Sequence, residues 1–319
     1  MQTNRRAFVV GAYLPNGGTL MAYHLGRILE QEFGFQAIAV AVGDETPAHG
    51  IHDYDLRMPV VSLQQMEDTI GAADVLVVNP SFSSHNFGWR LPGFKICYVQ
   101  GFNTFALLDR RFDHYVAVSG FVRDFLRTVY AIEARVIVPF IDLDRLPEAI
   151  DWAQRPPGVI LPYRKGMPDV WELSWQRLRG MLAERTPQIT FADPLGTSAV
   201  PHRELLSRLG GARYVLTLSA AEGFGLVPLE AMAMGALVIG YDGYGGREYM
   251  RPEENCAVAP FPQIERVAEL VTRALAEPER SATLARNGRE TALRYSYAAF
   301  RRAWIDELTI AFERRAARV

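Results

Sequence analysis

Short apolar runs alternate with longer periodic segments through the first half of the chain. The runs are almost continuously apolar, which is typical of parallel strands covered on both faces. We therefore expect strands at residues 7–15, 35–43, 74–80, 94–100, 113–120 and 134–140. After the first run, Met21, Leu25 and Ile28 recur at helical spacing, and Gly34 is a natural end for that helix.

A proline pair in the segment 151–158 interrupts the alternation, and we interpret this segment as a linker between domains. The alternation resumes with expected strands at 158–163, 188–193, 212–219 and 236–242. A helix that carries Trp171 and Leu178 on one stripe is expected between the first two of these strands. A last amphipathic helix is predicted where apolar residues recur every four positions, at Phe300, Trp304, Leu308 and Phe312.

Two successive series of strands and helices predict an α/β protein with two doubly wound, parallel-sheet, Rossmann-like domains. The expected domains are 1–150 and 151–295, followed by a C-terminal helical segment, 296–319. Ligand sites of such sheets lie at the carboxyl ends of the strands. We therefore expect the two domains to face each other across a ligand-binding cleft.

The composition narrows the class of protein. With 49% apolar and 22% charged residues, the 319-residue chain has the balance of a soluble globular enzyme. Its net charge of −2 and lack of a basic stripe argue against nucleic acid as a partner and allow at most weak peripheral membrane contact. No apolar run is long enough for a transmembrane segment. Cys97 and Cys256 are expected to be buried thiols of a reducing compartment, which indicates the cytoplasm, and no cysteine–histidine spacing indicates a metal site.

The stretch LSAAEGFGLVPLEAMAMG (218–235) carries the candidate chemistry. It joins an expected strand to a helix that should begin at Pro228, so it lies at the carboxyl edge of the second sheet. The helix N-terminus suits a phosphate, and the glycines allow close approach of the backbone. Glu222 and Glu230 could then accept hydrogen bonds from hydroxyls at the two ends of one ligand. Taken singly, Glu230 would merely complement the helix dipole and Glu222 would be a solvated loop residue, but the whole string favours a site.

This string closely resembles the E-x7-E signature of retaining nucleotide-sugar glycosyltransferases of the GT-B fold, glycosyltransferase family four (glycosyl transferases group 1). The resemblance implies that Glu222 contacts hydroxyls of the transferred sugar and that Glu230 binds the ribose of the nucleotide. It also implies that the donor sugar and diphosphate lie against the backbone of Gly223, Phe224, Gly225 and Leu226. The last segment, 296–319, is similar to the helix that crosses back to the N-terminal domain in these enzymes.

Other segments fit the same family less closely. Only two of the 34 basic residues are lysines, and one of them, Lys165 in VILPYRKGMPDVW, resembles the family's diphosphate-binding lysine. The adjoining Arg164 is a second candidate for binding the diphosphate. The alternative is that the two residues are a solvated basic pair. Gly17 and Gly18 resemble the family's Gly-Gly loop, which implies that they bind the donor by approaching its phosphate and also lie near the acceptor, although a plain turn would look the same. Gln100 stands where many members have a sugar-binding histidine.

Four further polar residues have roles that the sequence leaves open. Ser119 is either a ligand contact or a helix N-cap. His85 follows the expected strand at 74–80 and is a candidate for sugar or acceptor contact. His24 and His202 have no catalytic-triad or metal-ligand partner at a characteristic sequence spacing, and they are expected to be structural or at the surface.

The resemblance implies transfer of a hexose-type sugar from a nucleoside-diphosphate sugar to an acceptor hydroxyl, with retention of configuration. The acceptor would be a glycan, glycolipid or small molecule, as in bacterial polysaccharide, glycolipid or glycoside biosynthesis. Neither a cofactor nor a metal is implied, and Lys165 and Glu222 are the expected catalytic residues. Two alternatives remain: a non-catalytic sugar-nucleotide-binding or partner subunit, and an NAD-binding oxidoreductase that uses Asp44. Against the oxidoreductase, the first glycine loop of this chain lacks the G-x-G-x-x-G spacing.

Overall fold

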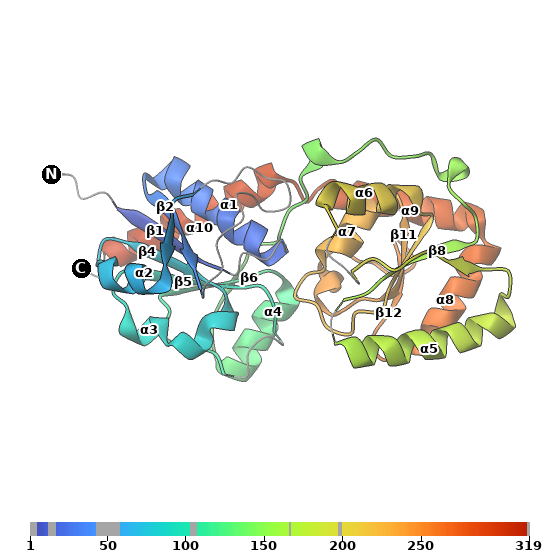
Figure 1. Cartoon of the computed structure of the whole chain (residues 1–319), viewed down its shortest axis with the longest axis horizontal. Helices are drawn as coiled ribbons and strands as arrows, with labels where there is room; N and C mark the ends of the chain where they lie inside the picture. The colour runs from blue at the N-terminus through green and yellow to red at the C-terminus, as the bar shows by residue number, and fades with distance from the viewer. Residues whose placement is uncertain are drawn as a thin grey trace. The chain divides into compact units, whose positions relative to one another are not determined.

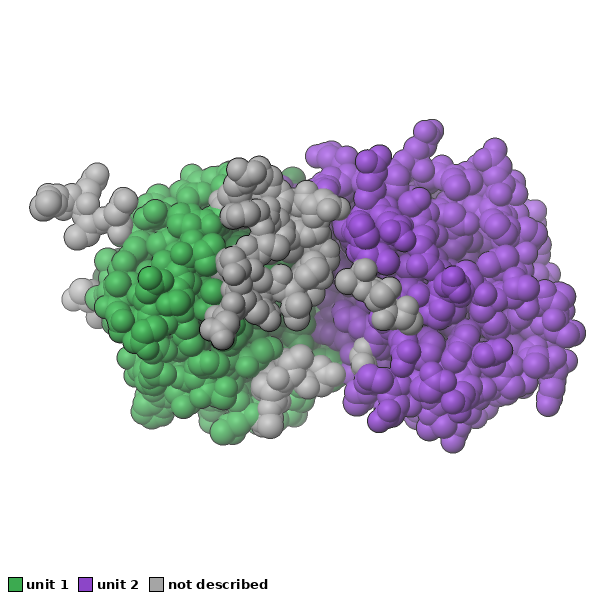
Figure 2. All heavy atoms as spheres, viewed as in Figure 1, with its two compact units in different colours: residues 1–139, 298–319 green, residues 140–297 purple. Residues whose placement is uncertain are grey.

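The structure is a computed structural model, and it describes residues 5–11, 17–42, 58–102, 107–165, 167–196 and 200–317. The chain forms two compact units (Figure 2). Unit 1 comprises residues 1–139 and 298–319, and unit 2 comprises residues 140–297. Asp44, the acid of the oxidoreductase alternative, lies outside the described residues.

Unit 1 is built on a seven-stranded sheet in which every neighbouring pair of strands is parallel (Figure 1). From one edge to the other the strands are β3 (Val60–Ser62), β2 (Gln36–Ala41), β1 (Arg6–Val10), β4 (Val75–Val78), β5 (Phe94–Val99), β6 (His114–Ala117) and β7 (Arg135–Val136). The order reverses beside β1, so a loop after β1 and a loop after β4 flank a topological switch point.

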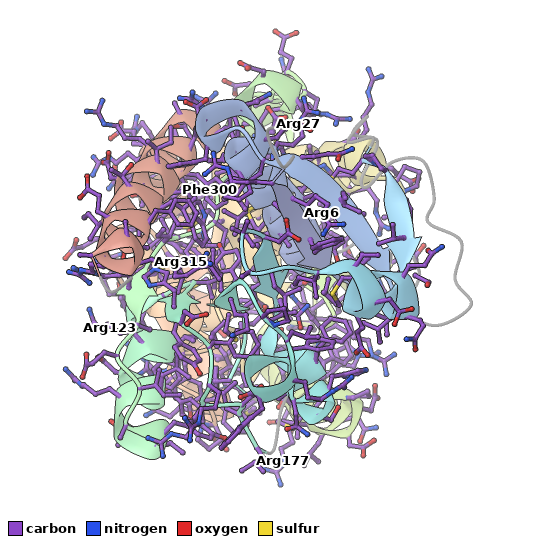
Figure 3. All side chains as sticks on the ribbon, turned by 90° about the vertical axis from the view of Figure 1, so that its left-hand side faces the viewer. Arg6, Arg27, Arg123, Arg177, Phe300 and Arg315 are labelled. Carbon is purple, nitrogen blue, oxygen red and sulfur yellow. The ribbon has the colours of Figure 1, made fainter. Side chains whose placement is uncertain are left out.

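The helices of unit 1 follow the strands along the chain. They are α1 (Gly17–Phe33), α2 (Leu63–Thr69), η1 (Pro80–His85), α3 (Phe87–Arg90), α4 (Gly120–Phe125) and its π-helical extension η2 (Leu126–Tyr130). The C-terminal helix α10 (Tyr297–Ala316) also packs on this unit: Phe312 contacts the rings of Phe33 and Phe94, and Trp304 contacts Tyr98. Figure 3 labels Phe300, which is buried, and Arg315 on this helix.

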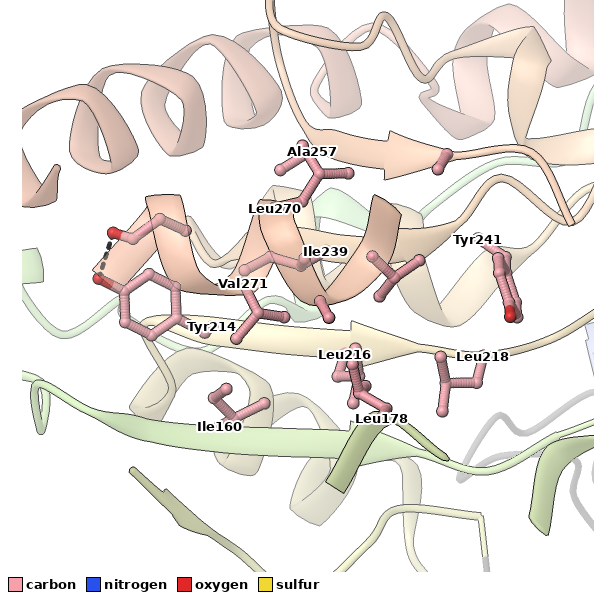
Figure 4. Packing of buried hydrophobic residues seen from close by; sticks show 14 of the residues in the cluster. Ile160, Leu178, Tyr214, Leu216, Leu218, Ile239, Tyr241, Ala257, Leu270 and Val271 are labelled. Atoms are coloured by element: carbon pink, nitrogen blue, oxygen red, sulfur yellow. Dashed lines mark hydrogen bonds between the residues drawn. The ribbon is translucent and has the colours of Figure 1, made fainter. Parts of the chain in front are cut away.

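Unit 2 contains a five-stranded parallel sheet. Its order is β12 (Ala257–Ala259), β11 (Leu237–Tyr241), β10 (Tyr214–Thr217), β8 (Val159–Tyr163) and β9 (Thr190–Phe191). Its helices are α5 (Pro168–Arg185), α6 (His202–Gly211), α7 (Leu226–Ala233), α8 (Ile264–Ala276) and α9 (Pro278–Ala292), with short turns η3 (Leu143–Arg145), η4 (Trp152–Gln154) and η5 (Gly245–Glu248). Leu216 on β10, Leu178 on α5 and Val271 on α8 belong to one buried cluster, within which Tyr214 donates to the Ala274 carbonyl (Figure 4).

The segment 151–158, which the sequence marks as a linker, is fastened to unit 2. Arg155 is only 3% exposed, and its guanidinium donates to the carbonyls of Ile150, Ala212 and Met234. The five donors of a guanidinium suit such a junction of carbonyls. Nearby, the Ile141 amide donates to the Tyr295 carbonyl at 2.7 Å, which joins the two stretches of chain that lead to and from unit 1.

The expected strands and helices are found, with shifted ends. Strands β3 and β12, of three residues each, were not expected from the sequence. The helix of the candidate loop begins at Leu226, so the expectation that it begins at Pro228 was wrong by two residues. The turn that starts it is made by Gly225 at φ +90°, a conformation that glycine adopts without a steric penalty.

Candidate functional site

Two loops are joined at the carboxyl edge of the unit 2 sheet. After β10, the Glu222 amide donates to the Gly243 carbonyl at 2.8 Å, and the Gly245 amide donates back to the Glu222 carbonyl at 3.1 Å. A side chain at position 245 would place its Cβ 2.2 Å from the Gly223 carbonyl oxygen. Glycine at 245 is therefore required for the loop after β11 to support the loop that carries Glu222.

Asp242 holds the second of these loops in shape. Its carboxylate accepts from the Tyr244 amide at 2.9 Å and from Arg247 Nε at 2.7 Å. Tyr244 has φ +64°, which is unusual for a residue with a side chain. The buried carboxylate thus stabilises a turn that the backbone alone would not favour.

Lys165 and Glu222 form an ion pair at this edge. The Nζ atom of Lys165, two residues after the end of β8, lies 3.0 Å from Glu222 Oε2. The lysine side chain is 53% exposed, whereas Glu222 is 7% exposed, so the pair has one buried partner and one that reaches the surface. The carboxylate raises the pKa of Lys165 above its ordinary value and keeps the amine charged.

The second carboxylate oxygen of Glu222 can still accept hydrogen bonds. Its Oε1 atom is buried and accepts no hydrogen bond from any described residue. A buried carboxylate oxygen without a donor is costly, and a ligand hydroxyl would remove that cost. This atom is the strongest sign in unit 2 that a polar ligand completes the site.

Tyr163, the last residue of β8, lies among the charged groups of the site. Its hydroxyl interacts with the Lys165 ammonium and has electrostatic interactions with the carboxylates of Glu222 and Glu230. Burial raises the pKa of Tyr163, so the phenol stays neutral. No pattern in the sequence indicates this residue, because its position depends on strands that are neighbours only in the sheet.

Aromatic side chains pack against the turn that leads into α7. Tyr249 donates from its hydroxyl to the Gly225 carbonyl at 2.6 Å, and its ring contacts Phe224 and Tyr295. Phe224 is buried, so at this position only the backbone is left to face a ligand. Leu226 follows as the first residue of α7, where backbone N–H groups lack intrahelical partners.

Glu230 is placed by a residue that sequence reasoning did not select. It lies within the second turn of α7, is 8% exposed, and its Oε1 atom lies 2.7 Å from His202 Nε2. His202, which was expected to be structural or at the surface, is the first residue of α6, and its ring nitrogen contacts this carboxylate. No sequence spacing links positions 28 residues apart, so only the fold could reveal the pair.

In unit 1 the structure joins two of the candidate residues. Gln100, just after β5, donates from Nε2 to the Gly18 carbonyl at 2.7 Å. Gly17 and Gly18 are the first residues of α1, and Gln100 therefore holds the start of that helix. The amide oxygen of Gln100 still has acceptor capacity for a ligand.

The remaining candidates have structural partners. Arg164 lies with its guanidinium 5.3 Å from the centre of the Trp171 ring. Ser119 is buried and caps α4, since its hydroxyl accepts from the Val122 amide at 3.3 Å. His85 stacks on Phe87 and touches the edge of Phe82, and its Nδ1 atom is buried without a partner among the described residues.

Three further features of the described part of the chain concern metal ligands, cysteine pairing and membrane-spanning helices. No group of three or more His, Cys, Asp or Glu there is arranged to hold a metal ion. Cys97 and Cys256 are unpaired and buried, as expected, and burial raises the pKa of both thiols, to about 12 for Cys256. Across the same ranges, helices long and apolar enough to cross a membrane are absent.

Comparison with known proteins gives this arrangement a context. Residues 197–291 match the family model of "Glycosyl transferases group 1", a range that includes Glu222, Glu230 and His202. No curated protein matches the chain significantly.

Solved structures match nearly the whole chain. The structure of Anabaena Alr3699/HepE in complex with UDP and glucose superposes with a TM-score of 0.76 at 14% identity, covering 96% of this chain and 99% of that one. Sucrose-phosphate synthase from Thermosynechococcus elongatus gives 0.68 at 16% identity, with 98% and 100% covered. A glycosyltransferase from Rickettsia africae gives 0.68 at 14% identity, with 98% of both chains covered. The two parallel-sheet units therefore have the GT-B fold, and the expected fold class is confirmed.

Proposed function

We propose that this protein is a retaining glycosyltransferase that moves a hexose-type sugar from a nucleoside-diphosphate sugar to an acceptor hydroxyl. One observation carries the proposal: Glu222, which lies in the range 197–291 that matches a glycosyltransferase family, pairs with Lys165, and its second oxygen is buried and accepts no hydrogen bond from the described residues. The neighbour Anabaena Alr3699/HepE was solved with UDP and with UDP-glucose, which supports a donor of this class.

The proposed donor lies along the carboxyl edge of the unit 2 sheet. Glu222 Oε1 accepts from a sugar hydroxyl, the N–H groups at the start of α7 face the diphosphate, and Glu230 accepts from the ribose. Lys165 is exposed enough to leave Glu222 in part and to meet a phosphate oxygen. An ammonium beside the diphosphate stabilises the charge that develops as it leaves.

The proposed reaction replaces one bond at the anomeric carbon by another. The bond from this carbon to the diphosphate oxygen breaks, and a bond to the acceptor oxygen forms on the same face. The acceptor's proton passes to the departing phosphate oxygen, so the protein needs no nucleophile of its own. Lys165 supplies positive charge at the leaving group, and we therefore propose that the reaction requires neither a metal ion nor another cofactor.

Unit 1 is the proposed acceptor-binding unit. The Gln100–Gly18 pair fixes the start of α1 at the carboxyl edge of its sheet and is the proposed point of contact, with His85 as a second candidate. A role in bacterial polysaccharide, glycolipid or glycoside synthesis in the cytoplasm is consistent with two buried, unpaired thiols.

A two-step experiment tests the proposal. The apparent melting temperature is first measured with ADP, CDP, GDP, UDP and dTDP and with their common sugar conjugates, since ligands that bind the native state raise it. The best donor is then incubated with the purified protein and candidate acceptors, and release of nucleoside diphosphate is measured. Donor binding with release of diphosphate supports the proposal; binding without turnover indicates a non-catalytic subunit, and binding of NAD alone indicates the oxidoreductase.

A further inference from the structure

The contact between His202 and Glu230 links α6 to α7. Both side chains are largely buried, at 13% and 10% exposure, and the nitrogen–oxygen distance of 2.7 Å is short for a hydrogen bond. A carboxylate can only accept, so His202 donates from Nε2 and the proton must be on that nitrogen. The contact therefore fixes both the histidine tautomer and the plane of the Glu230 carboxylate.

The two oxygens of Glu230 are consequently not equivalent. Oε1 is engaged by His202, whereas Oε2 accepts no hydrogen bond from the residues that the structure describes. Glutamate loses considerable rotamer freedom when its carboxylate is held in one place. A ligand hydroxyl that approaches Oε2 meets an acceptor whose orientation is already set.

We propose that His202 is a positioning residue for recognition of the donor's ribose: it holds Glu230 through Oε1 so that Oε2 accepts from a ribose hydroxyl. This inference rests on the proposed function, since it takes the ligand of Glu230 to be a nucleoside diphosphate. It adds a residue of α6, a helix outside the E-x7-E string, to the donor site. His202 acts only through Glu230 and takes no part in the transfer step.

The purely structural alternative is that the pair joins two helices and has no effect on the ligand. Both views predict that removal of His202 lowers stability. They differ in whether the loss of affinity depends on the ribose hydroxyls. A thermodynamic cycle between the protein side chain and the ligand hydroxyls therefore separates them.

The experiment measures dissociation constants by titration calorimetry. The probe is whichever of ADP, CDP, GDP, UDP and dTDP binds most tightly, together with its analogue that lacks the ribose hydroxyls. The proteins are the wild type, His202→Ala, His202→Gln, Glu230→Ala and Ser207→Ala, the last being an exposed position on the same helix. The quantity compared is the ratio of the affinities of the two nucleotides for each protein.

In the wild type, the hydroxyls should improve affinity about tenfold or more, as expected for a hydrogen bond to a charged group. His202→Ala and Glu230→Ala should bring this ratio close to one without changing the affinity of the hydroxyl-free nucleotide. His202→Gln, which can still donate, should recover part of the ratio, and Ser207→Ala should keep it whole.

Two results would overturn the inference. If His202→Ala keeps the wild-type ratio while Glu230→Ala abolishes it, His202 is structural only and the proposed function stands. If no nucleoside diphosphate binds the wild type, the proposed function fails and the role of His202 fails with it.

Discussion

Lys165 Nζ lies 3.0 Å from Glu222 Oε2, although the two residues are 57 positions apart. The contact exists because β8 and β10 are parallel neighbours, so the loops that follow them emerge at the same edge of the sheet. The pair neutralises the charge at the centre of the proposed donor site. A diphosphate would compete for the ammonium, and a sugar hydroxyl would satisfy the carboxylate oxygen that is left over.

Replacing Lys165 should abolish most of the activity. Lys165→Met removes the cation that faces the leaving diphosphate, and we expect turnover to fall at least about 100-fold, the usual effect of losing such a contact. The measurement is the initial rate of nucleoside diphosphate release with a saturating donor. Lys95→Met is the matched control, because Lys95 is the other lysine and pairs with Asp113 in unit 1. Equal rates for Lys165→Met and the control would contradict the assignment.

An alanine at position 245 should disrupt the loop that carries Glu222. Its Cβ would lie 2.2 Å from the Gly223 carbonyl oxygen and 2.5 Å from that of Glu222, so one of the two loops must move. We expect a loss of about 2 kcal/mol in the free energy of unfolding and a much weaker affinity for nucleoside diphosphate. Gly180→Ala is the control, because this exposed position in α5 has open space around it. This substitution should raise the free energy of unfolding by about 0.5–1 kcal/mol. Urea denaturation and calorimetry measure the two effects, and a Gly245→Ala variant as stable as Gly180→Ala would refute the close approach.

Tyr249→Phe should weaken the support beneath α7. The substitution deletes the buried hydroxyl that donates to the Gly225 carbonyl at 2.6 Å and keeps the ring. The expected loss in the free energy of unfolding is about 1–2 kcal/mol, with a severalfold weaker affinity for nucleoside diphosphate. Tyr295→Phe removes a longer bond, 3.3 Å to the Glu248 carbonyl, and should cost less in both measurements. The reverse order of the two variants would argue against a role of Tyr249 in holding the turn.

The stability of unit 1 should fall as the pH is lowered. His114 packs against α10 near Glu307, and burial together with Arg314 and Arg135 lowers its pKa to about 4. The unfolded chain takes up this proton near pH 6.5 but the folded chain only near pH 4, so the free energy of unfolding decreases between about pH 7 and 4 and changes little below that from this residue. Burial raises the pKa of Glu307, which therefore binds its proton first in the folded state and offsets part of the decrease.

His114→Gln should remove this part of the pH dependence. The difference in the free energy of unfolding between pH 7 and pH 5, measured by urea denaturation, should shrink by about 2 kcal/mol relative to the wild type. If the variant shows the same pH dependence as the wild type, His114 is not the group that titrates.

The sequence predicted the sheets well because their signal is local. Parallel strands covered on both faces are continuous apolar runs, and strands such as β1, β5 and β11 follow from that alone. Strands β3 and β12, of three residues each, were missed. The start of α7 was misplaced because Pro228 suits the first turn of a helix in general, whereas the turn is in fact made by Gly225.

The candidate site was predictable only where it is continuous in the chain. Glu222 and Glu230 stand in one string, and Lys165 drew notice through the rarity of lysine. Tyr163 and His202 reach the same site from other elements, and no spacing in the sequence connects them to it. The bond between Gln100 and Gly18 was likewise hidden, although each residue had been selected separately.

The most direct test of the central claim is a crystal structure of the protein with its tightest-binding nucleoside diphosphate. The account predicts the diphosphate within hydrogen-bonding distance of Lys165 Nζ and the start of α7, with a ribose hydroxyl on Glu230 Oε2. A nucleotide bound away from both Lys165 and Glu230 would contradict it.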